Sequence, residues 1–156
     1  MSRITSKEMP WSHWHERLHK KLLNNHKLLP KGSSLLLSVS GGQDSMALLK
    51  LFTDLQRLHD WKIHVWHGDH GWHNKSRQIA KELNQWCEKE NLDFHCDHAM
   101  KEKTKTEKTA RDWRYEYLAK RANDLSLEEQ SSPCQYVLTA HTSSDRAETF
   151  IMNLAR

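Results

Sequence analysis

Cysteine and long apolar runs are scarce in this chain, and each shortage excludes a class of protein. Its 3 cysteines, Cys87, Cys96 and Cys134, are too few and too scattered for a disulfide framework, which favours a reducing compartment. Apolar runs such as Leu35–Leu37 are far shorter than the roughly 18 residues that a bilayer span needs. The N-terminal residues also lack the apolar stretch that a secretory signal contains. We therefore expect a cytoplasmic protein with no membrane partner.

Length and charge predict one modest domain. The 156 residues are typical of a single domain with at most an appendage, and a hydrophobic share of 37% makes the core thin. Lysine and arginine number 24 against 20 acidic residues, which gives a formal net charge of +4 at pH 7. The 12 histidines can add positive charge below about pH 6.5. This balance permits a polyanionic partner without requiring one.

Hydrophobic spacing switches regularly between the helix and strand types along the chain. Helices are expected at 11–27, 44–59, 76–90, 106–123 and 147–154, and strands at 35–39, 61–66, 92–96 and 136–139. In the first helix, helical spacing relates Trp11, Trp14, Leu18 and Leu22. Strands separated by helices pair in parallel through right-handed crossovers. We therefore predict an α/β fold with three layers and a parallel sheet, whose ligands bind at the carboxyl ends of the strands.

One segment carries a specific chemical signal. The first strand runs into Ser40-Gly41-Gly42-Gln43-Asp44-Ser45 and then into a helix. Small residues let backbone N–H groups turn toward an anion at the helix N-terminus, which predicts a phosphate cradle. The alternative is a plain glycine turn in which Asp44 caps the helix. Because S-G-G-x-D-S arises by chance at about one in 10⁶ start positions, we favour the cradle.

Residues 40–45 resemble the pyrophosphate loop (PP-loop) of the N-type ATP pyrophosphatases, which split ATP into AMP and pyrophosphate. Three further segments narrow the resemblance to the tRNA(Ile)-lysidine synthetases. Gly68–Gly71 is similar to that family's D-H-G, Ala110–Tyr115 to its A-R-x-x-R-Y, and Ala140–Thr149 to its A-H-x-x-D-D-x-x-E-T. The resemblance spans residues 34–154 and implies a Rossmann-like fold of the adenine nucleotide alpha hydrolase type.

The chain departs from the family pattern in three places. Trp72-His73 stands where the family commonly has Leu-Arg, and Ser144-Asp145 replaces the usual pair of aspartates. The chain also ends where the family continues, so we expect the N-terminal portion of a longer enzyme. Within it, residues 1–30 are expected to form a helical extension and residues 31–156 the PP-loop ATP-binding catalytic domain.

The reaction that the resemblance implies has two steps. ATP adenylates the C2 carbonyl oxygen of the wobble cytidine in tRNA(Ile) with a CAU anticodon, and the amine of free L-lysine then displaces AMP to give lysidine. The substrates are therefore ATP, lysine and this tRNA, with Mg²⁺ as the expected cofactor. Whether the protein forms a homodimer stays open.

The resemblance also assigns the site residues. It gives ATP binding to Ser40, Gly41, Gly42, Gln43, Asp44 and Ser45, catalysis to Asp44, Arg111, Arg114, His141, Asp145 and Glu148, and Mg²⁺ to Asp44 and Asp145. Asp145 and Glu148 are three apart at an expected helix start, so their carboxylates share a face for metal or lysine.

Each assignment has a structural alternative. The two arginines can instead pair with Asp112 or Glu107, and the two acids can be solvated residues favoured by the helix dipole. His141 can equally be a packing residue. The lysine-rich stretch at 101–108 suits a phosphate contact or a solvated loop. His67, His70 and His73 do not converge in the expected strand-to-loop geometry, so we expect no zinc site.

Other functions remain as alternatives. Another PP-loop ATP pyrophosphatase, either a tRNA thiolase or an amide-forming synthetase, would share the loop. The chain contains no C-x-x-C, which counts against thiolases that use an iron–sulfur cluster. A fragment that binds ATP or tRNA without catalysis is the alternative from another class.

Overall fold

The computed structural model describes residues 11–72, 74–143 and 146–153, with the backbone alone from residue 141 onward. Its helices are α1 (His13–Asn24), α2 (Gln43–His59), α3 (Ser76–Lys89) and α4 (Glu107–Glu128), with a short 3₁₀ turn η1 (Lys101–Lys103). The strands are β1 (Ser34–Ser38), β2 (Lys62–Asp69), β3 (Asp93–His98), β4 (Cys134–Ser143) and β5 (Arg146–Asn153). Among the helices in these ranges, none combines the length and the apolar character of a membrane span.

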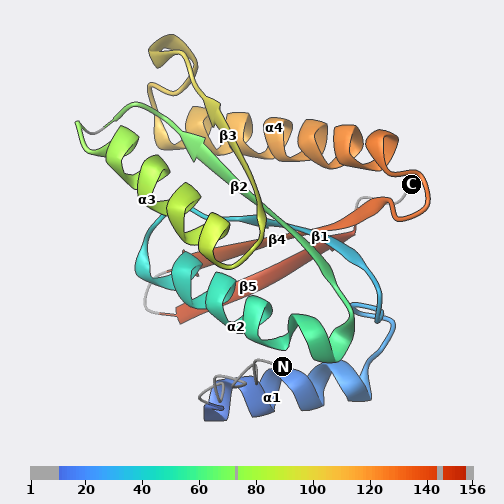
Figure 1. The fold of residues 1–156 in the computed structure, drawn as a ribbon. Coiled ribbons are helices and arrows are strands. Elements are labelled where there is room, and N and C mark those ends of the chain that lie inside the picture. Colours follow the sequence, from blue (N-terminus) through green and yellow to red (C-terminus); the bar gives the residue numbers. More distant parts are fainter. Residues whose placement is uncertain (1–10, 73, 144–145, 154–156) are drawn as a thin grey trace, which may run out of the picture.

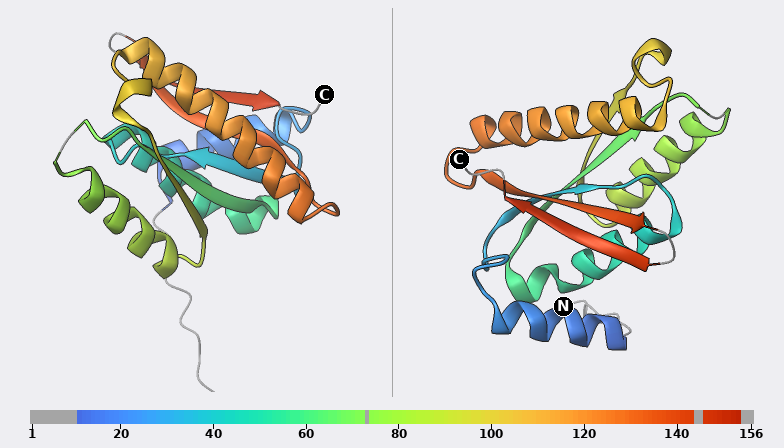
Figure 2. Two further views of the ribbon diagram at one scale, coloured as in Figure 1. Left: turned by 90° about the horizontal axis from the view of Figure 1, so that it is seen from above. Right: turned by 180° about the vertical axis from the view of Figure 1, so that it is seen from behind.

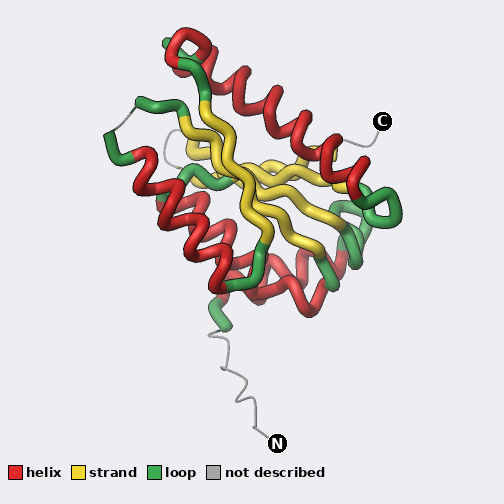
Figure 3. The backbone as a smooth tube through the Cα atoms, turned by 45° about the horizontal axis from the view of Figure 1, so that its top comes forward, coloured by secondary structure: helices red, strands yellow, loops and turns green. Residues whose placement is uncertain are grey.

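The strands form one sheet in the order β3-β2-β1-β4-β5. The first four are parallel, and β5 joins β4 antiparallel. α1, α2 and α3 lie on one face of the sheet and α4 on the other (Figures 1 and 2). The tube in Figure 3 shows the strands side by side between these helices. The predicted three-layer, parallel-sheet, Rossmann-like α/β fold is confirmed.

The expected helix at 147–154 is wrong, because residues 146–153 form β5 instead. Thr149, Phe150 and Ile151 are β-branched or aromatic and fit a pleated strand. The outer edge of β4 also offers unpaired backbone groups, which β5 satisfies through a register that runs from Ser143↔Arg146 to Tyr136↔Asn153. Helical spacing in a short apolar run did not distinguish these two outcomes.

β1 is buried on both faces, and this divides the core in two. Leu35 and Leu37 point to the face that carries α1, α2 and α3, where the larger apolar cluster lies. Leu36 points to the opposite face and packs in a smaller cluster with Trp66, Trp113 and the inner residues of α4. A continuous apolar strand between two helical layers is typical of parallel sheets.

A polar contact helps to dock α1 on α2. The N–H of Ser12 donates to Nδ1 of His15 at 3.0 Å, so Nε2 carries the imidazole proton and donates to Asp54 at 2.8 Å. Both His15 and Asp54 are buried. Of the residues at helical spacing, Leu22 is buried but Trp14 is 64% exposed, so the buried stripe differs from the expected one.

Asp54→Ala should lower the free energy of unfolding by about 1–3 kcal/mol, because it leaves the buried His15 N–H without an acceptor. Lys50→Ala is the matched control, since Lys50 pairs with the same carboxylate from the solvent side. It should cost less than about 1 kcal/mol. Urea unfolding monitored by circular dichroism measures both, and equal losses would contradict the role given to His15.

Candidate phosphate-binding site

The direction of the connections reverses at β1. From β1 the chain passes through α2 to β2 and through α3 to β3, always to the same side. It then crosses the other face through α4 and returns to the opposite side of β1 as β4. Ligands of open parallel sheets bind at the carboxyl ends of the strands where the order reverses. Here that point lies between the ends of β1 and β4.

The loop of residues 40–42 leaves β1 at this point and needs a glycine at its centre. Gly41 has φ +88°, and a Cβ there would lie 2.6 Å from Cγ2 of Ile79 on α3. The buried Ser45 fastens the loop from within: its hydroxyl donates to the Gly42 carbonyl at 3.0 Å and accepts from the Ser40 N–H at 3.2 Å. The loop is therefore held in one shape by the chain itself.

The N-terminus of α2 is open to a ligand. Gly42 is the N-cap, so the alternative in which Asp44 caps this helix is wrong; Asp44 lies in the first turn. Gly42 has no side chain to cap α2, and the Ser40 hydroxyl accepts from the Gly42 N–H at 3.3 Å, whereas Thr106 caps α4 by accepting from the Thr109 N–H. The N–H groups in the first turn of this 17-residue helix and its dipole therefore lie at the carboxyl edge of the sheet, which favours an anion there.

His67 on β2 supports the loop, although the sequence analysis considered it only as a metal ligand. Its Nδ1 donates to the carbonyl of Val39 at 2.7 Å, immediately before Ser40. Burial lowers the pKa of His67, so the ring is neutral at pH 7. Its buried Nε2 has no partner among the described residues. Strand alternation is the signal that could have found it, because His67 shares a face with the core residue Val65.

The second motif forms a tight turn against aromatic rings. A Cβ at Gly68 would lie 2.5 Å from Trp66 and 2.8 Å from Trp113. Asp69 accepts from the Gly71 N–H at 2.8 Å and lies 3.0 Å from His98. Burial would raise the pKa of Asp69, but these hydrogen bonds lower it below its usual value. The carboxylate of Asp69 is therefore buried and ionised, while Gly71 at the end of the turn is exposed.

The third motif brings two arginines to the α4 side of this edge. Trp113 is buried in the core as expected, while Arg114 is half-buried and Arg111 exposed. Burial lowers the pKa of His70, and the charge of the neighbouring Arg114 lowers it further. Neither arginine forms an ion pair within the described residues, which contradicts the alternative of pairing with Asp112 or Glu107. Both remain available to an anion.

The fourth motif lies on β4 and β5, on the other side of β1 from β2. Ser38 of β1 pairs with Thr139 of β4, so the backbone of His141 runs beside the start of the loop. His141 and Glu148 occupy paired positions on β4 and β5. The expectation that Asp145 and Glu148 share a helix face is wrong, since Glu148 lies in a strand; Asp145 lies outside the described residues.

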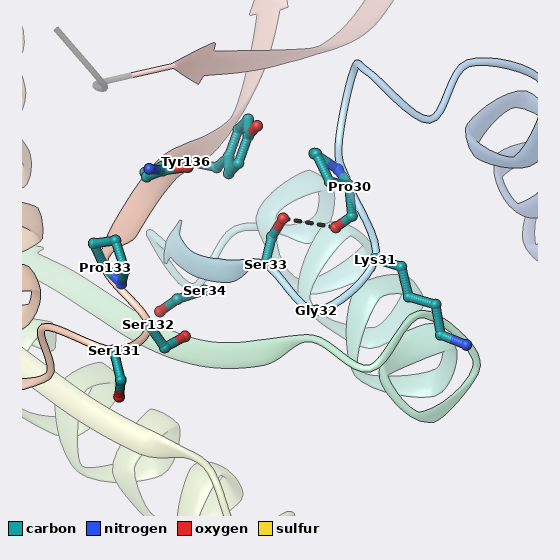
Figure 4. Close-up of a pocket in the computed structure, with 10 residues that line it drawn as sticks. Pro30, Lys31, Gly32, Ser33, Ser34, Ser131, Ser132, Pro133 and Tyr136 are labelled. Carbon is teal, nitrogen blue, oxygen red and sulfur yellow. Dashed lines mark hydrogen bonds between the residues drawn. The ribbon is translucent and has the colours of Figure 1, made fainter.

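A cavity lies at the opposite end of the sheet. Its volume is about 210 Å³, and it lies beside the starts of β1 and β4, between residues 30–34 and 131–136 (Figure 4). Ser33 there donates to the Pro30 carbonyl at 2.6 Å. None of the expected site residues lines it, so this cavity is separate from the candidate site.

The cysteines do not form a cluster. They lie on α3, β3 and β4, and all are free thiols: Cys87, Cys96 and Cys134. Burial raises the pKa of each thiol to about 11, so they are protonated at pH 7 and are poor nucleophiles.

Fold and loop together define an α/β phosphate-binding domain. The family model for the PP-loop domain, ATP_bind_3, matches residues 12–156. The chain belongs to this PP-loop domain family. This match confirms the family membership that the sequence predicted, and the roles of residues 40–45 stay a prediction.

Curated relatives show which PP-loop proteins this chain is similar to. The tRNA(Ile)-lysidine synthase of Prochlorococcus marinus strain SARG is 62% identical over 100% of this chain and 46% of its own length. That of Parasynechococcus marenigrum is 49% identical over 95% of this chain and 42% of its own. The resemblance expected from the four motifs is confirmed, and the chain spans less than half the length of these relatives.

A solved structure shares the fold. A U34-tRNA thiolase from Methanococcus maripaludis superposes with a TM-score of 0.55, at 17% identity, over 81% of this chain and 43% of its own. At this identity the likeness establishes the architecture alone.

Gly41→Ala should destabilise the protein more than Gly32→Ala does. Both glycines have positive φ, which costs alanine about 1–2 kcal/mol, but nothing lies within 4 Å of a Cβ at Gly32. The contact with Ile79 should add about 1–3 kcal/mol at Gly41. Urea midpoints measure the difference. Equal losses of stability in the two variants would show that the loop accommodates the added Cβ at Gly41 without strain.

Stability should fall as the pH drops below about 6.5, and His67 should contribute to the fall. Its folded pKa is lowered by burial, against the opposing effects of the Val39 carbonyl and Asp69, while His98 lowers it further. Between its folded and unfolded pKa the unfolded chain binds more protons, so the free energy of unfolding decreases with decreasing pH. His67→Gln should flatten this dependence, whereas His26→Gln, at an exposed position, should not. Denaturant titrations from about pH 7.5 to 5.5 test this, and parallel curves for His67→Gln and wild type would contradict it.

Proposed function

We propose that this chain is the ATP-splitting part of an enzyme that attaches L-lysine to the C2 position of the wobble cytidine in tRNA(Ile) with a CAU anticodon. The observation that carries the proposal is the uncapped N-terminus of α2 behind a glycine turn at the reversal point of the sheet. The relatives named tRNA(Ile)-lysidine synthase support the choice among PP-loop enzymes.

In the first step the C2 carbonyl oxygen of cytidine attacks the α-phosphorus of ATP, and the bond between the α- and β-phosphates breaks. Negative charge then accumulates on the departing pyrophosphate. The loop of Ser40, Gly41, Gly42, Gln43 and Ser45 would bind it: the Gly41 and Gln43 N–H groups would donate to it, and the internal hydrogen bonds among Ser40, Gly42 and Ser45 would hold these donors in place before the reaction. The internal hydrogen bonds of Ser45 support such a preorganised loop.

Asp44 would hold Mg²⁺ against the phosphates. Its carboxylate lies in the first turn of α2, partly exposed, and carboxylate oxygens are ligands that Mg²⁺ prefers. When bound, the ion would neutralise charge on the triphosphate, whose own oxygens would complete the coordination. Asp145 is our second proposed ligand.

In the second step the neutral amine of lysine attacks C2, AMP leaves with the former carbonyl oxygen, and the amine loses its proton. Arg111 and Arg114 would grip phosphate through forked guanidinium groups. Glu148 or Asp145 would bind an ammonium group of lysine, and His141 would contact phosphate or take the proton. The backbone register of His141 beside the loop supports a role for it at this edge.

We also propose the division of the chain into residues 1–30, a helical extension, and residues 31–156, the catalytic domain. The contact of His15 with Asp54 supports an extension that packs on this domain.

Asp44→Asn in the full-length enzyme should reduce AMP formation by about 100-fold or more, because the ATP phosphates lose their metal-binding carboxylate. The assay contains ATP, Mg²⁺, labelled lysine and CAU-anticodon tRNA(Ile), and it measures AMP and the lysine incorporated into tRNA. Glu16→Gln is the matched control, since Glu16 is likewise an acid in the first turn of a helix, α1. It should leave the rate unchanged.

The same assay separates the alternatives. ADP instead of AMP as the product would overturn the PP-loop chemistry. Sulfur or glutamine-derived nitrogen accepted in place of lysine would indicate a thiolase or an amide-forming synthetase. ATP binding by this chain without turnover, restored in the full-length protein, would indicate that residues 1–156 are catalytically inert alone.

A further inference from the structure

A tryptophan stands exposed but fixed at the carboxyl edge of the sheet. Trp72 lies in the connection from β2 to α3, and its side chain is 48% exposed. Its indole N–H donates to the carbonyl of Thr104 at 2.8 Å, and Thr104 is fully buried. The ring is therefore anchored to a rigid point on the segment that leads into α4, and it does not need to be ordered when a ligand arrives.

A series of rings connects Trp72 to the core. The His70 ring lies 5.4 Å from Trp72 and 5.2 Å from Trp113. Trp113 is buried and packs against Trp66 at 5.9 Å and Tyr117 at 4.7 Å. Packing against these rings supports Trp72 from within, so its outward surface presents a stable aromatic face.

Positive charge is concentrated on the segment that anchors Trp72. The segment that anchors Trp72, residues 100–108, is called here the lysine loop. It carries four exposed lysines against two exposed glutamates, Lys101, Lys103, Lys105 and Lys108 against Glu102 and Glu107. Met100, at the start of the loop, is 67% exposed and adds apolar surface. An aromatic face among cations is complementary to an unpaired nucleobase and its phosphates.

The lysine loop and Trp72 lie at the same edge as the phosphate-binding loop. β2 is the direct neighbour of β1, and β3 is the next strand outward, so their carboxyl ends follow one another along the sheet (Figure 3). η1 and the start of α4 lie above the end of β3 (Figure 1). Gly41 lies against Ile79, so α3 borders the phosphate-binding loop. The connection that contains Trp72 leads directly into α3.

Another exposed tryptophan lacks this setting. Trp14 is 64% exposed on α1, and Arg17 already lies over its ring at 5.5 Å. The helix that carries it, α1, lies on the opposite face of the sheet from α4 (Figure 1). Trp14 therefore provides a matched control of the same residue type.

We propose that Trp72 is a stacking platform for an unpaired base of an RNA loop, and that the lysine loop binds the adjoining phosphates. The RNA is the anticodon loop of the tRNA assigned under the proposed function, on which this inference rests. Stacking on Trp72 would hold a neighbour of the reacting cytidine and so position the cytidine toward the phosphate-binding loop. Trp72 is then a positioning residue and takes no part in the bond changes.

The test uses the full-length enzyme and an anticodon stem-loop RNA with the sequence CAU, with binding measured by fluorescence anisotropy at fixed salt. Trp72→Leu keeps an apolar side chain but removes the ring, and it should raise Kd about tenfold. Trp72→Phe keeps a ring and should stay within about threefold of wild type, and Trp14→Leu should bind as wild type does. An unchanged Kd for Trp72→Leu would overturn the proposal.

Two further measurements guard against a misfolded variant. Calorimetry should give the same affinity for ATP in Trp72→Leu and wild type, which a merely structural defect at this edge would change. Ultraviolet irradiation of wild-type enzyme with 5-iodouridine in the loop should yield a crosslinked peptide that contains Trp72. Crosslinks confined to other peptides would overturn the stacking proposal.

The lysine loop predicts a salt effect. Lys103→Gln should reduce the slope of log Kd against log salt concentration by about 0.7–0.9, the value for one phosphate contact. An unchanged slope in variants of all four lysines would show that the lysine loop does not contact the RNA phosphates.

The outcomes distinguish this inference from the proposed function. Lysidine formation by wild type with normal RNA binding by Trp72→Leu refutes the platform alone. Weakened RNA binding by Trp72→Leu in an enzyme that forms no lysidine refutes the proposed reaction and leaves the platform standing.

Discussion

The close approach of Gly41 to Ile79 is the constraint on which the site depends. A backbone can lie this near a side chain only where no Cβ intervenes, and the positive φ of Gly41 turns the loop back over the start of α2. Ile79 is in turn fixed because α3 is anchored to the sheet by the buried residues Leu83 and Cys87. The apolar core on one face of the sheet thus sets the shape of a polar loop at its edge.

The opposite face contributes a different kind of constraint. Trp113 packs on Trp66 and fills the space that Gly68 leaves open, which fixes the first half of α4 against the sheet. Arg114 follows Trp113 directly and is carried to the same edge as the loop. Burial lowers the pKa of Arg114, yet arginine remains charged at pH 7. One layer therefore shapes the candidate anion site, and the other carries a half-buried arginine at the same edge of the sheet.

The sequence predicted the parts that rest on local rules. β1 and α2 were expected because a continuous apolar run and a glycine turn precede a clear helical period, and both elements lie within a residue or so of the expected bounds. The helix at 147–154 was wrong because its local pattern was ambiguous and the edge of β4 decided the outcome. The supporting contacts of the site could not be predicted in this way. His67 reaches the Val39 carbonyl 28 residues away, and Trp72 reaches the Thr104 carbonyl 32 residues away. Such bonds depend on strand order, which residue spacing does not encode.

The strand order would also let a triphosphate and an RNA loop bind at different places along the carboxyl edge of the sheet. A triphosphate needs closely spaced N–H donors, and the turn between β1 and α2 concentrates them at a single point. An RNA loop needs a wider surface of rings and cations, and the connections after β2 and β3 spread these outward from that point. Because β2 lies between β1 and β3, these two proposed surfaces would adjoin without competing for the same backbone groups. A reaction that joins a nucleobase oxygen to a phosphorus atom requires such an arrangement, since the two reactants must approach each other while each is held by its own part of the chain.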